Sequence, residues 1–295
     1  MYSIVCPSSH RTAWLLARRT GIGASEAACL VGEDPRKSLV RLYLDKVSDE
    51  PPDDTSVEMF DWGLRHETTL RLAYSEDRYA GRKTWDASML LRSESYPWAL
   101  ATIDAWTNRA VYQDDPYIPL ELKTTEIWHA DDWVDGCPRR YWWQLQHQML
   151  VTGAAHASIA CLIGVHRFVW DDVARSEEAI ARIVAAGERF WGFVERREIP
   201  PGPMDAATLS AAYPAPEPVT VQLDGEWIGM DQARQNYRTS AASTSKLAEA
   251  IDDRLRGAIG NAERAVLPNG VIYTLTPNKR GVRSLRRIAP KEPIP

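Results

Sequence analysis

Two short apolar segments, each with charged residues inside it, constrain the fold of this chain more than any other feature. Residues 98–106 and 117–125 are rich in Leu, Ile, Ala and Thr, and both are predicted to be β-strands. Asp104 lies in the first segment, and Glu121 and Lys123 lie in the second. Alternate residues of a strand share a face, so Glu121 and Lys123 project together. If the two strands are antiparallel neighbours, Asp104 joins them on one side of a sheet.

This trio suits metal-assisted phosphodiester chemistry. Mg²⁺ prefers oxygen ligands and keeps several waters, so Asp104 and Glu121 fit its coordination. Paired carboxylates can hold two ions about 4 Å apart across a phosphodiester, and Mn²⁺ is expected to substitute. Lys123 would position or deprotonate the attacking water and stabilise charge on the phosphate. The alternative is a surface Glu–Lys pair on a half-exposed strand, and the three-residue pattern alone does not exclude it.

Polar residues on the flanking helices add to the prediction. Residues 57–79 have the apolar spacing of a long helix that carries Glu67, with four candidate buried positions (Met59, Trp62, Leu70 and Tyr74). Residues 138–151 are expected to form a helix entered through a proline, and they carry Gln144 and Gln148 one turn apart. Each polar residue also has an ordinary explanation, as a solvated helix glutamate or a good helix former.

The remaining pattern predicts an α/β (α+β) chain. A short strand is expected at 88–92, a strand pair at 157–163 and 167–170, and a long helix at 176–196. We expect a core domain over 1–199 and a proline-rich linker over 200–225. An extension over 226–295 would hold one helix (230–259) and a β-hairpin whose basic end contacts DNA or is simply solvated.

Composition narrows the functional class without deciding it. No apolar run approaches the roughly 20 residues that span a bilayer, so we expect a cytoplasmic protein without membrane contact. The four cysteines are scattered, which favours reduced thiols over a disulfide framework or a zinc ribbon. The net charge of −5 is unusual for a DNA-binding protein, but acidic metal sites and clustered basic residues reduce the objection.

Four ordered motifs resemble the YqaJ-like viral recombinase and phage lambda exonuclease nucleases of the PD-(D/E)xK superfamily. The resemblance covers about residues 14–196. Its motifs are Trp14-x3-Arg18-x2-Gly21-Ile22-Gly23-Ala24-Ser25-Glu26, Trp62-Gly63-x2-His66-Glu67, Ile103-Asp104 with Glu121-Leu122-Lys123, and Tyr141-x2-Gln144-Leu145-Gln146-His147-Gln148-Met149. It implies a restriction-endonuclease-like core, in which a mixed central sheet is flanked by helices.

The resemblance also implies roles for the central residues. Asp104 and Glu121 would bind metal with the Leu122 carbonyl, and Lys123 would act on the attacking water. Two further residues would assist, Glu67 as an outer carboxylate and Gln144 by orienting Lys123 or the phosphate.

A second set of residues would bind the DNA end. Arg18 and Ser25 match a pocket for the 5′-phosphate, and Arg36 or Lys37 would complete it.

The implied activity is a Mg²⁺-dependent 5′→3′ exonuclease on linear double-stranded DNA ends, in phage-type recombination. A single-strand annealing protein is the expected partner, in the cytosol of a bacterial host, and assembly of the nuclease as a homo-oligomer is left open. Two alternatives stay open: a structure-specific or restriction-like endonuclease of the same superfamily, and a non-catalytic DNA-end-binding scaffold.

Overall fold

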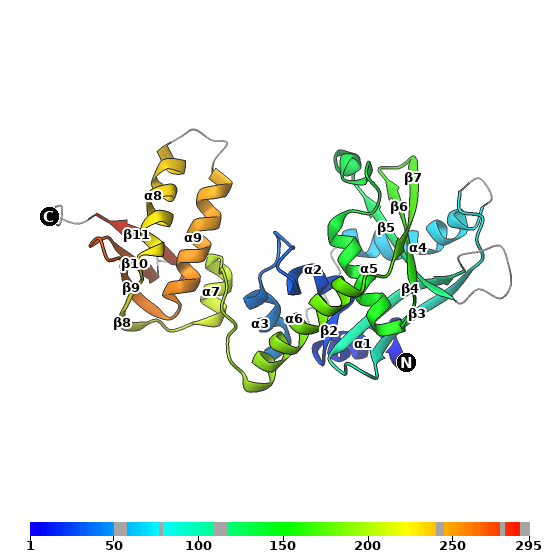
Figure 1. Cartoon of the computed structure of the whole chain (residues 1–295), viewed down its shortest axis with the longest axis horizontal. Helices are drawn as coiled ribbons and strands as arrows, with labels where there is room; N and C mark the ends of the chain where they lie inside the picture. Colours follow the sequence, from blue (N-terminus) through cyan, green and yellow to red (C-terminus); the bar gives the residue numbers. More distant parts are fainter. Residues whose placement is uncertain (50–57, 77–78, 109–116, 240–244, 278–280, 290–295) are drawn as a thin grey trace. The chain divides into compact units, whose positions relative to one another are not determined.

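A computed structural model describes residues 1–49, 58–76, 79–108, 117–239, 245–277 and 281–289. The chain folds as two compact units (Figure 1), one of Met1–Pro35 with Lys46–Arg196 and one of Arg36–Asp45 with Arg197–Pro295. In the described ranges, no helix combines the length and the apolar character needed to cross a bilayer.

The first unit contains a mixed sheet and the helices that cover it. Its strands are β1 (Tyr2–Pro7), β2 (Ile22–Gly23), β3 (Thr84–Ser93), β4 (Ala99–Thr107), β5 (Ile118–Thr125), β6 (His156–Ile163) and β7 (Arg167–Ala174). Its helices are α1 (Arg11–Arg19), η1 (Ala24–Glu26), α2 (Ala27–Leu30), α4 (Glu58–Tyr74), η2 (Ile127–Trp133), α5 (Arg139–Thr152) and α6 (Glu177–Arg196). The helix α3 (Leu39–Val47) crosses the boundary between the units.

The sheet has the order β1-β3-β4-β5-β6-β7, and β2 pairs with β4 outside this path. The β5–β6 and β2–β4 pairs are parallel, whereas the other pairs are antiparallel. Parallel neighbours need a crossover connection, and α5 provides it between β5 and β6. The mixed sheet flanked by helices confirms the fold class predicted from the sequence.

Helices α4 and α5 cover opposite faces of the sheet. Leu70 and Tyr74 of α4 share a buried cluster with Leu120 of β5. Leu145 of α5 shares a different cluster with Ile159 of β6. Ala160 of β6 belongs to the first cluster, so both faces of β6 are buried, which explains why β6 is an almost uninterrupted apolar run.

Specific polar contacts hold α4 in place, and a glycine ends α5. The Tyr74 hydroxyl at the end of α4 donates to Ser158 Oγ at 3.1 Å. Arg82 donates two hydrogen bonds of 2.7 Å to the Asp172 carboxylate, and one of 3.2 Å to the Tyr74 oxygen. Helix α5 ends at Gly153, whose φ of 77° is a left-handed conformation that glycine adopts without strain.

The second unit is built on its own sheet. Its strands are β8 (Glu217–Gln222), β9 (Ala262–Val266), β10 (Ile272–Pro277) and β11 (Arg283–Ile288), in the order β11-β10-β9-β8. Its helices are α7 (Ala206–Ala212), α8 (Glu226–Thr239) and α9 (Ser245–Ile259). Helices α8 and α9 lie on one side of the strands in Figure 1. Leu255 of α9 and Tyr273 and Leu275 of β10 belong to the core between these layers.

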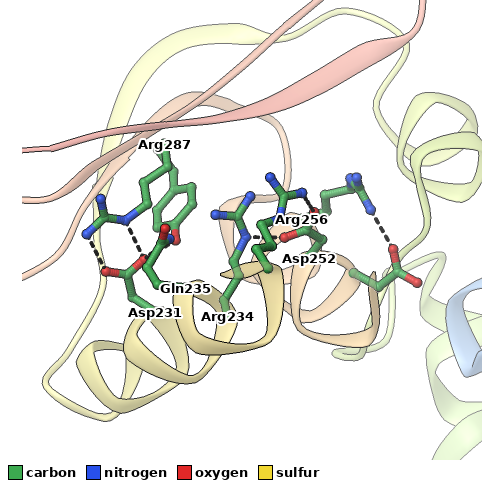
Figure 2. Close-up of polar contacts among 9 residues, drawn as sticks. Asp231, Arg234, Gln235, Asp252, Arg256 and Arg287 are labelled. Atoms are coloured by element: carbon green, nitrogen blue, oxygen red, sulfur yellow. Dashed lines mark hydrogen bonds and ion pairs between the residues drawn. The ribbon is translucent and has the colours of Figure 1, made fainter. Parts of the chain in front are cut away.

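Buried ion pairs accompany this second core (Figure 2). Arg287 holds Asp231 with two hydrogen bonds, from Nε at 2.6 Å and from Nη2 at 2.7 Å. Arg234, which is almost fully buried, pairs with Asp252, and Arg238 adds a 2.8 Å bond to the same carboxylate. These three guanidinium groups therefore neutralise Asp231 and Asp252.

The structure corrects the expected organisation of the C-terminal third. The stretch 200–225, expected as a linker, contains α7 and β8 and contributes Leu209 to the second core. The single helix expected over 230–259 is two helices, α8 and α9, and the expected hairpin is part of a four-stranded sheet. Proline is tolerated in β8 because this strand is at the edge of its sheet, where one side of the backbone needs no ladder hydrogen bonds.

Candidate active site

A fork between two central strands positions the predicted carboxylates. Strands β4 and β5 pair from Thr107↔Ile118 to Ala105↔Leu120, where their recorded pairing ends. Ala105 and Leu120 are directly opposite, so the next residues, Asp104 and Glu121, project toward the other face. The Asp104 carboxylate Oδ2 then accepts a hydrogen bond from the Leu122 N–H at 2.9 Å. A side chain thus continues the strand pairing where the fork opens.

Glu121 is the most enclosed of the acidic residues of the site, with 2% of its surface exposed. Its Oε1 accepts a hydrogen bond from Gln144 Nε2 at 2.6 Å, and its Oε2 accepts one from Gln148 Nε2 at 2.5 Å. The two glutamines lie one turn apart on α5, as the sequence spacing predicted. Gln144 therefore contacts Glu121, whereas its expected role in orienting Lys123 stays a prediction. Sequence reasoning gave Gln148 no role, although its spacing from Gln144 was the available signal.

Lys123 completes the trio from the same strand. Its Nζ donates a hydrogen bond to Glu121 and lies 5.5 Å from the centre of the Tyr141 ring. Burial by itself would lower the pKa of Lys123, but the carboxylates of Glu121 and Asp104 outweigh it and hold the pKa above its ordinary value. Lys123 is therefore an ammonium group at neutral pH.

Burial and neighbouring carboxylates raise the pKa values of two acidic groups of the site, Asp104 and Glu67. Burial is the largest cause of the raised pKa of Asp104, followed by the Glu121 charge. Glu67 reaches the same region from α4, and burial and Glu121 raise its pKa to about 7, with Lys123 opposing. Asp86 of β3 also raises the pKa of Glu67. Asp86 was missed from the sequence because β3 begins at Thr84, four residues before the strand expected at 88–92.

The residues present fit a partly hydrated hard cation. Bringing carboxylates together costs free energy through charge repulsion, and a bound cation would remove this cost. All acceptors of the site are oxygens, the ligands that Mg²⁺ prefers. The Gln148 Oε1 is buried and has no hydrogen-bond partner among the described residues. No compact group of three His, Cys, Asp or Glu residues occurs in that part of the chain, so an ion here would keep waters or phosphate oxygens as further ligands.

His147 lies on α5 between Gln144 and Gln148, but its ring packs in the core and does not belong to the site. Its ring packs edge-on against Trp98, with ring centres 6.2 Å apart. Burial lowers the pKa of His147 to about 4, so the imidazole is neutral at physiological pH. His147 is therefore a packing residue beneath the turn that holds Ile22. The next residue along the helix, Gln148, faces Glu121.

The N-terminal motif lies over β4, on the face that carries Asp104. Trp14 Nε1 donates to Thr102 Oγ1 at 3.0 Å, and Thr102 shares that face because it precedes Asp104 by two residues. The Arg18 guanidinium stacks on the Trp14 ring at 4.6 Å and donates to Ser25 Oγ at 3.2 Å. Arg18 and Ser25, predicted as partners in one pocket, are therefore in contact.

A glycine turn brings this motif against the strand. A Cβ atom at Gly21 would lie 2.5 Å from the Trp98 carbonyl oxygen and 2.8 Å from the Leu100 side chain, so only glycine fits there. The buried Glu26 closes the turn by accepting a 2.7 Å bond from the Gly23 N–H and a 3.0 Å bond from Lys46 Nζ. Glu26 belonged to the predicted motif, and its role is structural.

Arg36 and Lys37 belong to the second compact unit. Lys37 Nζ pairs there with Asp45 at 2.6 Å. Their part in a phosphate pocket with Arg18 stays a prediction.

Comparison with known proteins supports the interpretation of these motifs. The family model for the YqaJ-like viral recombinase domain matches residues 13–155. These residues form a YqaJ-like viral recombinase domain. The domain includes the N-terminal motif and the carboxylate–lysine site, that is, Trp14, Arg18, Ser25, Glu67, Asp104, Glu121, Lys123, Gln144 and Gln148.

One curated relative of the YqaJ-like domain is the uncharacterized protein YqaJ of Bacillus subtilis (strain 168). It is 32% identical to this chain over 184 residues, which are 61% of this chain and 55% of that protein. The match thus spans little more than half of the relative.

Solved structures share the fold of the YqaJ-like domain. The alkaline exonuclease LHK-Exo from Laribacter hongkongensis aligns with a TM-score of 0.50 at 17% identity, and its complex with dAMP aligns with 0.51 at 18%. Each alignment covers 62% of this chain and 92% of the exonuclease. The domain therefore has an exonuclease-like fold.

Proposed function

We propose that this chain is a Mg²⁺-dependent exonuclease that hydrolyses phosphodiester bonds from the ends of linear double-stranded DNA. The observation that supports this most directly is the convergence of Asp104, Glu121 and Lys123 where β4 and β5 diverge. Crowding buried carboxylates costs folding free energy, and a protein that only binds DNA gains nothing from it. The arrangement therefore favours catalysis over a non-catalytic scaffold. The fold shared with an alkaline exonuclease, one structure of which contains dAMP, agrees with a DNA substrate.

In this proposal Asp104, Glu121 and the Leu122 carbonyl would hold the metal, which we expect to be two ions. Bound Mg²⁺ would polarise the phosphate and make a bound water more acidic. Mn²⁺ is expected to substitute, because it accepts the same oxygen ligands.

Lys123 acts as a donor rather than as a base, because its contact with Glu121 keeps it protonated. It orients the attacking water and balances negative charge on the phosphate. Glu67 is the better proton acceptor of the site, since its pKa of about 7 places it between its two states at neutral pH. Gln144 and Gln148 hold Glu121 in the orientation that this arrangement needs.

Recognition of the DNA end is assigned to Arg18 and Ser25. The guanidinium and the hydroxyl are in contact and face outward, and together they offer charge-assisted donors to a 5′-phosphate. This assignment implies attack from the 5′ end, in the 5′→3′ direction. The exposed 3′ strand would then be the substrate of a single-strand annealing partner in phage-type recombination.

Three DNA substrates in Mg²⁺ test the proposal. A linear duplex with 5′-phosphates should be digested, the same duplex without them should be digested more slowly, and a closed circular duplex should stay intact. Cleavage of the circle would show an endonuclease instead. Binding without cleavage of any substrate would show an end-binding scaffold.

An Arg18→Ala variant is the matched test of end recognition. It should erase the difference between phosphorylated and unphosphorylated ends while turnover on unphosphorylated duplex stays the same. An unchanged preference would show that the pocket lies elsewhere.

A further inference from the structure

One face of the four-stranded sheet in the second unit is left uncovered by the described helices of that unit. Ala265, Tyr273 and Leu275 point into the core against α9, so their neighbours along each strand point to the opposite face. None of these neighbours at positions 264, 266, 272, 274 and 276 is fully buried. Among the described residues, the core cluster of this unit includes Ala265, Tyr273 and Leu275 but none of these five neighbouring positions. We call this uncovered side the outer sheet face.

Strand register places two arginines in one row across the outer sheet face. Arg286 of β11 is directly opposite Thr274 of β10, and Thr274 is directly opposite Arg264 of β9. Thr220 of β8 is paired with Arg264 and ends the row. Because neighbouring strands are roughly 4.8 Å apart, the two arginine backbones are about 10 Å apart.

These two arginines differ from those on the inner side. Arg287 and Arg234 pair with carboxylates of α8 and α9 (Figure 2), and Arg238 pairs with the same carboxylate as Arg234. Arg264 and Arg286 are exposed, and neither forms a hydrogen bond, ion pair or ring contact with another residue in the described ranges. The arginines at Asp231 and Asp252 are therefore paired with acids, whereas the two arginines on the outer sheet face are not.

The other groups near this row favour an anionic partner. Ser284 and Thr276 form the next directly opposed pair, which adds hydroxyl donors. The strand acids lie elsewhere: Glu263 precedes Arg264 and faces the inner Arg283, and Glu217 is beyond the irregularity at the start of β8. The chain as a whole has a net charge of −5, so a row of arginines and hydroxyls without an acid is a local exception to its acidic character.

We infer that the outer sheet face binds the phosphate backbone of duplex DNA. Hydroxyl and guanidinium groups are the side-chain donors that contact phosphates without reading sequence. Phosphates recur about every 3.4 Å along each strand of duplex DNA, so guanidiniums about 10 Å apart can each reach one. Single-stranded DNA is less suited, because base stacking needs aromatic side chains and the ring of β10, Tyr273, points into the core.

This inference shares its substrate class with the proposed nuclease function but concerns a different unit and no chemical step. It is tested with the full-length chain and a covalently closed circular duplex in EDTA, so that neither hydrolysis nor an end contributes. Binding is measured by filter retention from 50 to 200 mM NaCl. An Arg264→Gln/Arg286→Gln double variant should reduce the salt slope by about 1.8, so that over this range it loses about tenfold less affinity than the parent chain.

The matched control is Arg254→Gln on α9, whose side chain is 54% exposed and whose acidic neighbour, Glu226, is 3.9 Å away. The control removes one positive charge from the same unit and should leave the slope unchanged. The Arg264→Lys/Arg286→Lys variant should keep most of the slope, because it keeps the charges. If the double variant fails to fold, Thr220→Glu at the exposed end of the row should weaken binding in the same direction.

Three outcomes would overturn the inference. They are an unchanged slope in the double variant, an equal loss of slope in Arg254→Gln, and an equal loss of slope on a closed single-stranded circle. The last outcome would assign the face to single-stranded DNA. Failure of the nuclease test leaves this binding result standing, and failure of the binding test leaves the nuclease proposal standing.

Discussion

The Asp104 carboxylate accepts a hydrogen bond from the Leu122 N–H at 2.9 Å. This one side chain therefore joins strands β4 and β5 and also supplies the central acid of the candidate site. The structural part of this contact needs only an oxygen acceptor, whereas metal binding needs the negative charge. The two parts can therefore be separated by a substitution that keeps the oxygen and removes the charge.

Asp104→Asn makes this separation. We expect turnover in Mg²⁺ to fall at least about 100-fold, since charge stabilisation by a bound cation is worth several kcal/mol. Burial raises the pKa of Asp104, so the ionised carboxylate costs stability, and the Tm of Asp104→Asn in EDTA should equal or exceed that of the parent chain. Asp104→Ala should lose activity and also lower the Tm. Activity that survives in Asp104→Asn would contradict the assignment of Asp104 as a ligand.

Glu67 predicts a specific pH dependence of stability. Its pKa is raised to about 7 in the folded chain, so the native state binds more protons than the unfolded state between about pH 4.5 and 7. Its contribution is fully present below this window and is lost as the pH rises through 7. Without metal, Glu67→Gln should be more stable than the parent chain at pH 8, and the difference should vanish near pH 4.5.

The measurement for Glu67 is the free energy of unfolding by denaturant at several pH values in EDTA. Glu188→Gln on the exposed side of α6 is the control and should show no such dependence. If the stability of both variants changes with pH in the same way, Glu67 does not interact with the other carboxylates of the site.

The site was predictable from the sequence as far as it depends on local periodicity. Alternation along β5 placed Glu121 and Lys123 together, and helical spacing placed Gln144 and Gln148 together. The same reasoning failed for Trp62, which is 53% exposed although its spacing matched the buried Leu70 and Tyr74. Helical periodicity defines a face of α4 but does not say how far the sheet beneath it extends.

The second unit was less predictable because its packing is non-local. Val40 lies in the same buried cluster as Met204 and Leu209, more than 150 residues later, so α3 belongs mainly with the C-terminal sheet. Proline-rich composition indicated a linker over 200–225, whereas the edge position of β8 lets Pro218 lie within a strand. No pattern within either segment reveals its partner.

The glutamines on α5 give a prediction about buried hydrogen bonds. Gln148→Leu removes the only described donor to Glu121 Oε2, which is buried. An acceptor left without a partner costs about 1–3 kcal/mol, and more when it is charged, so the free energy of unfolding in EDTA should fall by at least this amount. Gln232→Leu, at an exposed position of α8, should change stability by less than about 0.5 kcal/mol. Equal effects of the two substitutions would show that Gln148 does not support Glu121.

The glycine turn beside β4 gives a prediction that compares two glycines. At Gly21 a Cβ atom would lie 2.5 Å from a backbone oxygen, whereas at Gly229 within α8 no atom outside the helix lies within 4 Å. Gly21→Ala should therefore lower the free energy of unfolding by about 1–3 kcal/mol through overpacking. Gly229→Ala should raise it by about 0.5–1 kcal/mol, because alanine favours a helix interior.

The same glycine pair also reports on the site. Displacement of the turn at Gly21 moves Trp14 from Thr102, and with it Arg18 and Ser25 relative to Asp104. Gly21→Ala should therefore reduce the preference for 5′-phosphorylated ends in digestion assays below its melting temperature, whereas Gly229→Ala should retain that preference. If Gly21→Ala keeps full preference despite its lower stability, the position of the N-terminal motif on β4 does not control end recognition.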